Sequence, residues 1–148
     1  MWFTPLRRMC PLVLLMVSPL AAKAMCCPGD VNVIKSSGSG LGQTQPLATD
    51  QSLDPRWNVH AFERDSISYF QISDVAEGLL FIIAKSGDVF WLLPAGTIDA
   101  QVALPSDHQP QRPSLDAKEV FRHPDFTLLV SGTGKAAAWR VENRPAMP

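Results

Sequence analysis

A glycine-rich segment that ends in lysine is the first feature that could bind a ligand. Residues 132–135, Gly-Thr-Gly-Lys, resemble the end of a phosphate-binding loop, in which backbone N–H groups and the lysine hold nucleotide phosphates. The full motif needs another glycine five positions before the second one and a serine or threonine after the lysine, but Leu129 and Ala136 stand there. We therefore interpret this segment as a turn between two strands.

Histidines are the other candidates for acid–base or metal chemistry, and the chain has three: His60, His108 and His123. No two of them have the spacing of metal ligands, and no cysteine lies near any of them. His60 could form an acid–base pair with Glu63, although a strand histidine near a tryptophan is more often structural. No serine lies in a nucleophile-elbow pattern. The sequence therefore predicts no catalytic residue, no metal site and no cofactor, and we expect that the protein is not an enzyme.

Residue types that anchor protein interfaces are the more informative group. Binding hot spots are enriched in Trp, Tyr and Arg. The proline-rich segment 104–113 adds further candidates, because a stiff loop loses little conformational entropy when it binds. The residues that we expect to contact a protein partner are Trp57, Arg64, Tyr69, His108 and Arg112.

The chain begins with a segment that is typical of a cleavable secretory signal. Two arginines and no acid lie in the first eight residues, and the twelve residues 9–20 are apolar except for Ser18. This run fits a signal-peptide core and is shorter than the ~20 residues of a membrane-spanning helix. The small residues of Ala22-Lys23-Ala24 predict cleavage after Ala24, so that residues 1–24 form the signal peptide.

We therefore expect a periplasmic protein that is not stably inserted in a membrane after cleavage. An uncleaved anchor and a twin-arginine signal are alternatives. A lipid on Cys26 or Cys27 is a less favoured alternative, because neither cysteine follows the residues that lipoprotein signals use. A disulfide between these adjacent cysteines would strain the peptide between them, so a hydrophobic core must hold the domain. Whether the pair is oxidised, lipidated or free stays open.

The chain after Ala24 has the size of one domain and an acidic balance. The 148 residues include 13 basic and 14 acidic side chains; three of the basic ones and none of the acids precede residue 25, which leaves a formal net charge of −4. Nucleic acids attract clustered Lys and Arg, whereas the basic residues here are scattered singly. We therefore expect no nucleic-acid partner.

The elements that must position these residues are short strands that follow a flexible segment. Residues 25–53 include a Ser-, Gly- and Gln-rich stretch at 36–45, which has the composition of a flexible linker. We place the flexible N-terminal segment at 25–53, an all-β domain at 54–143 and a C-terminal tail at 144–148.

Consecutive hairpins are expected along this domain. Runs rich in β-formers flank polar breaks at 63–66, 85–88 and 124–125. The apolar run Leu79–Ala84 predicts a central strand that is buried on both faces. Because no helical apolar period is present, about seven short strands predict an all-β fold, a small and mostly antiparallel sheet or sandwich.

Three short motifs lie in the first half of the expected domain: W-x-V-x-x-F-E-R-D at 57–65, Y-x-Q at 69–71 and L-P-x-G at 93–96. With them, residues 54–98 resemble a group of small exported bacterial proteins of mostly unknown function. Some small periplasmic proteins of this general sort are immunity proteins, which neutralise toxins delivered by antibacterial secretion systems. The resemblance carries no functional motif, so it transfers no site residues.

Binding of a protein partner is the function that we expect. An immunity protein that neutralises an antibacterial effector toxin needs a rigid surface that fills a cleft of the toxin, and it needs no chemistry of its own. One alternative is an envelope assembly or structural accessory protein, and another is a small periplasmic hydrolase or redox enzyme. A homo-oligomer is also possible. The sequence identifies neither the partner nor the face that binds it.

Overall fold

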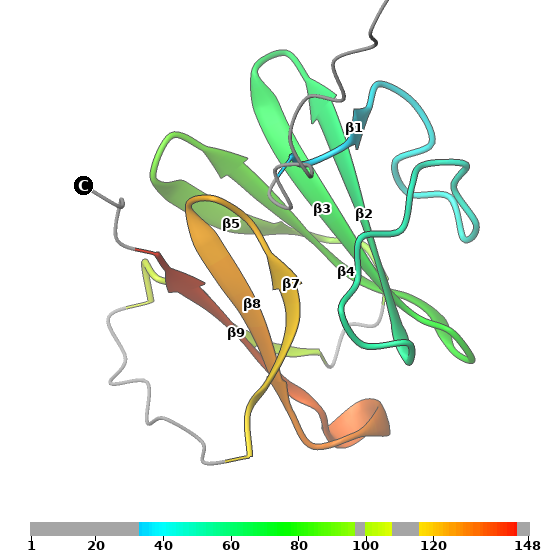
Figure 1. Cartoon of the computed structure of the whole chain (residues 1–148), viewed down its shortest axis with the longest axis vertical. Helices are drawn as coiled ribbons and strands as arrows, with labels where there is room; N and C mark the ends of the chain where they lie inside the picture. Colours follow the sequence, from blue (N-terminus) through cyan, green and yellow to red (C-terminus); the bar gives the residue numbers. More distant parts are fainter. Residues whose placement is uncertain (1–32, 97–99, 108–115, 145–148) are drawn as a thin grey trace, which may run out of the picture. The chain divides into compact units, whose positions relative to one another are not determined.

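The computed structural model describes residues 33–96, 100–107 and 116–144, which form two β-sheets (Figure 1). The expected signal peptide, its cleavage site, the cysteine pair and residues 145–148 lie outside these ranges. No helix in the described ranges is long and apolar enough to cross a membrane.

Sheet A has five strands in the order β1-β2-β3-β4-β5. Three hairpins join β2 to β5, and every pair is antiparallel except β1 with β2. β4 lies inside the sheet with a run of buried residues, as predicted for a central strand. The strands are β1 Ser36–Ser37, β2 Trp57–Arg64, β3 Ile67–Asp74, β4 Gly78–Ser86 and β5 Val89–Leu93.

Sheet B has four strands in the order β6-β9-β8-β7. β8 is antiparallel to both of its neighbours, whereas β6 runs parallel to β9. The expected turn at 132–135 leads into one 3-10 turn, Gly134–Ala136, between β8 and β9. The strands are β6 Gln101–Ala103, β7 Lys118–Arg122, β8 Phe126–Ser131 and β9 Ala138–Asn143. The prediction of an all-β, mostly antiparallel fold is confirmed.

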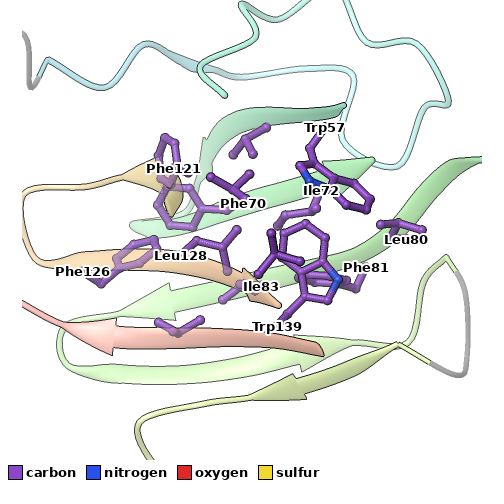
Figure 2. Packing of buried hydrophobic residues seen from close by; sticks show 14 of the residues in the cluster. Trp57, Phe70, Ile72, Leu80, Phe81, Ile83, Phe121, Phe126, Leu128 and Trp139 are labelled. Atoms are coloured by element: carbon purple, nitrogen blue, oxygen red, sulfur yellow. The ribbon is translucent and has the colours of Figure 1, made fainter. Parts of the chain in front are cut away.

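The core lies between the two sheets and draws alternate residues from both (Figure 2). Trp139 of β9 in sheet B packs against two rings of sheet A. Its ring centroid is 4.8 Å from that of Trp57 and 5.2 Å from that of Phe81, both in edge-to-face geometry. This geometry places the positive edge of one ring on the negative face of another, which adds to the free energy of burial.

The L-P-x-G motif has a structural reason at its glycine. Gly96 has a φ of +82°, and a Cβ atom at this position would collide with the backbone carbonyl of Leu80. Only glycine accepts this conformation and leaves room for the carbonyl. The chain therefore passes close to the backbone of β4 three residues after β5 ends.

The N-terminal segment differs from the flexible linker that its composition suggests. In the structure residues 33–53, which we call the strap, hydrogen-bond to the sheets. The side chain of Gln71 on β3 is fully buried; its Oε1 accepts the N–H of Gly42 at 2.8 Å, and its Nε2 donates to the carbonyl of Gln43 at 2.7 Å. The N–H of Gln51 donates to the carbonyl of Val59 on β2, and the N–H of Leu53 donates to the carbonyl of Val120 on β7. The expectation of a free linker is therefore wrong for residues 33–53, and residues 25–32 lie outside the described ranges.

The substitution Gln71→Leu should release the strap. Loss of two hydrogen bonds at about 1 kcal/mol each raises the fraction of molecules with an open strap by roughly 30-fold. Cleavage of the open form follows this population when opening is fast, so limited proteolysis should cut residues 38–47 correspondingly faster. Gln45→Leu, at an exposed position of the strap, is the control and should digest as wild type. Equal digestion of both variants would contradict the role of Gln71.

Candidate functional site

The five residues expected to contact a partner do not form one surface. Trp57 is only 2% exposed and packs on Trp139, so the expectation that it anchors a partner at the surface is wrong. The two-residue period of β2 turns its ring towards sheet B. His108 and Arg112 lie outside the described residues.

Arg64 and Tyr69 do share a face. Arg64 pairs with Ile67, which is two residues before Tyr69, and Phe70 points into the core. Because side chains alternate along a strand, both residues lie on the outer face of sheet A, which is turned away from sheet B. Arg64 is exposed and Tyr69 is half-buried.

Register adds a second aromatic ring to this face. Tyr69 pairs with Ala84 on β4, and Ala84 pairs with Trp91 on β5. The two aromatic residues therefore stand two strands, or roughly 10 Å, apart on either side of a methyl group. We call Tyr69, Ala84 and Trp91 the aromatic row. Trp91 was not among the residues expected to contact a partner, because only strand pairing brings it to the same face as Tyr69.

The strap covers one half of the outer face and leaves the other half more open. Phe62 of β2 is buried, and a Cβ atom added to Gly40 of the strap would lie 3.6 Å from its ring. On β5, by contrast, Val89 is 61% exposed, and Trp91 and Leu93 are half-buried. Exposed apolar residues that lie together often mark an interaction surface.

Polar side chains lie buried on the covered half of the face. His60, Gln71 and Ser73 are all buried, and no group in the described ranges bonds His60 Nδ1 or Ser73 Oγ. His60 lies on the outer face, whereas Glu63, an odd number of residues away, lies on the other. The alternative of an acid–base pair between His60 and Glu63 is therefore not formed, in line with the structural role that was favoured for His60.

A cluster of charged groups surrounds His123 near the turn between β7 and β8. Lys85 Nζ lies 2.7 Å from Asp125 Oδ2, and the N–H of Asp125 donates to His123 Nδ1 at 3.1 Å. The imidazole stacks on Phe126, with centroids 4.8 Å apart. Burial lowers the pKa of His123 to about 4, so the ring is neutral at pH 7.

This cluster joins the turn to its neighbours. Arg144 donates to the carbonyl of His123 at 3.1 Å, and its own N–H donates to the carbonyl of Asp125 at 2.7 Å. A hydrogen bond from Lys85 lowers the pKa of Asp125, which favours the ion pair. Within residues 33–96, 100–107 and 116–144, no group of three or more His, Cys, Asp or Glu side chains could hold a metal ion.

Comparisons with protein-family models, curated protein sequences and solved structures find no match. Arg64 and the aromatic row are the described residues of interface-forming types that share the outer face of sheet A.

Proposed function

We propose that this protein is a periplasmic immunity protein that binds and neutralises an antibacterial effector toxin. The observation that supports the proposal is the outer face of sheet A, on which Arg64 of β2, Tyr69 of β3 and Trp91 of β5 lie. These are the three residue types that dominate binding hot spots. The face combines them with exposed apolar area at β5.

A rigid sheet suits an inhibitor. Tyr69 and Trp91 each offer a large contact area with two rotatable side-chain bonds, so little entropy is lost on binding. Arg64 can bind a carboxylate with two parallel hydrogen bonds. The surplus of acids after residue 24 would speed association with a basic toxin.

Capture of the tagged protein from the envelope of its own host should recover one stoichiometric protein partner, which mass spectrometry then identifies. Tyr69→Ala and Trp91→Ala should each weaken the affinity for that partner by about 2 kcal/mol, or roughly 30-fold. The control is Leu47→Ala, because Leu47 is a fully exposed apolar residue of the strap. Isothermal titration calorimetry measures the affinities of the wild type and of the three variants.

Other results would favour other functions. Recovery of the protein alone from toxin-producing cells would contradict a tight binder. Deletion of the gene distinguishes an immunity protein from an envelope assembly accessory. Sensitivity to toxin in mixed culture supports immunity, whereas an envelope defect in pure culture supports an assembly accessory. Wild-type affinity in both aromatic variants would show that the partner binds elsewhere.

A further inference from the structure

β5 is an edge strand of sheet A (Figure 1). It pairs with β4 on one side, and no described strand pairs with its other side, which we call the free side. Ser86 pairs with Val89 across the two-residue turn Gly87-Asp88. Residues that flank such a turn form a hydrogen-bonded pair, and such pairs alternate along the ladder. Val89, Trp91 and Leu93 therefore direct their backbone groups to β4, and the N–H and C=O groups of Phe90 and Leu92 point to the free side.

The other sheet edges carry features that discourage further pairing. β1 has two residues and β6 has three. β7 contains three charged residues and a register irregularity between Glu119 and Phe121, and the carbonyl of Val120 already accepts the N–H of Leu53. Short strands, charges and bulges are the usual protection of a sheet edge. β5, with the five apolar residues Val-Phe-Trp-Leu-Leu, has none of these charges or irregularities.

We propose that β5 pairs with β5 of a second copy of this chain, antiparallel about a two-fold axis at Trp91. The backbone groups fit this register. Phe90 lies opposite Leu92 of the second copy, and these two residues form two N–H···O=C bonds with each other. By symmetry, Leu92 and Phe90 of the second copy form two more, so the pairing adds about four bonds. Trp91 lies opposite its own copy in a pair that needs no hydrogen bond, as its groups are already directed to β4.

The side chains also favour a second copy. Val89 lies opposite Leu93, and every side chain in the ladder is apolar, so no like charges meet. The pairing covers Val89 and Leu92, which are 61% and 38% exposed. Pro94 has no N–H, which limits the ladder to the five residues of β5. The aromatic rows of two copies would join into one face. This pairing requires no toxin and is independent of the proposed function.

Analytical ultracentrifugation of the purified protein tests the pairing and should give twice the chain mass. Leu92→Pro removes an N–H that faces the free side, so the β4–β5 ladder remains while the dimer dissociates into folded monomers. Val89→Lys and Val75→Lys form a matched pair, because these valines are 61% and 63% exposed and Val75 lies at the turn between β3 and β4. Lysine at 89 should weaken the dimer at least tenfold, and lysine at 75 should not.

A cysteine pair tests the register in a chain whose three native cysteines are replaced by serine. Trp91→Cys places two Cα atoms about 4.5 Å apart across the axis, within reach of a disulfide. Val89→Cys places them about 13 Å apart, since four residues separate them along the strands. Only the cysteine at 91 should cross-link on oxidation.

Either of two results would overturn the proposal. One is a wild-type protein that stays monomeric from micromolar to hundreds of micromolar concentrations. The other is a Leu92→Pro variant that is folded, as circular dichroism shows, and whose dimer is as stable as that of the wild type. If Leu92→Pro unfolds, Val89→Lys tests the proposal in its place. A Val89→Lys dimer as stable as the Val75→Lys dimer would show that the dimer does not form through β5.

Discussion

Trp139→Ala should lower the free energy of unfolding by about 3–5 kcal/mol. The ring of Trp139 is buried and is the piece of sheet B that touches both Trp57 and Phe81 of sheet A. Alanine would leave a cavity where the two sheets meet, because neighbours in a close-packed core relax only in part. Urea unfolding followed by far-ultraviolet circular dichroism measures the loss without relying on tryptophan fluorescence.

Trp139→Phe is the control for this substitution. It keeps an aromatic ring against Trp57 and Phe81, so the loss should be clearly smaller than that of the alanine variant. A loss below about 1 kcal/mol in Trp139→Ala would mean that the two sheets do not share this contact.

Acidification from pH 6.5 to pH 4 should remove up to about 3 kcal/mol of stability through His123 alone. Burial lowers the pKa of this imidazole from 6.5 to about 4 in the folded protein. The unfolded chain therefore takes up a proton at this residue before the folded one does. The stabilisation is complete above pH 6.5 and is lost as the pH falls towards 4. Urea midpoints measured between pH 4 and pH 8 give this dependence.

His123→Gln identifies the residue responsible. The neutral amide cannot titrate, so the variant should lose clearly less stability than the wild type between pH 6.5 and pH 4, and the difference is the share of His123. Carboxylates add losses that begin near the lower end of this range: hydrogen bonds from Arg56 lower the pKa of Asp54 to about 2, so its contribution falls from about pH 5 downwards. If the wild type and His123→Gln lose stability in parallel, His123 is not the source.

The hairpins of sheet A could be predicted from the sequence because neighbouring residues specify both their strands and their turns. The run 79–84, the glycine turn and the run 89–93 specify β4 and β5 without knowledge of the rest of the chain. The parallel pairs β1–β2 and β6–β9 join segments that are far apart in sequence, and no local pattern encodes such a pairing.

The faces of β2 were harder to assign than its existence. Sheet B covers one side of this strand and the strap covers the other, so apolar residues occur on both sides, and Trp57 could not be assigned to the core. The strap itself was misread because composition does not show that one buried glutamine, Gln71, holds two of its backbone groups. Arg64 and Tyr69 were predicted as partner-binding residues, but only the register places Trp91 beside Tyr69.

The position of β9 affects the order in which the two sheets can fold. β9 is the last of the described strands, yet it lies inside sheet B between β6 and β8. Until residues 138–143 join the folding chain, β6 lacks its neighbour and the inner face of sheet A has no Trp139 to cover it. A chain that stops before β9 would therefore expose apolar core and invite proteolysis. The two sheets can therefore enclose the core only after β9 has joined sheet B.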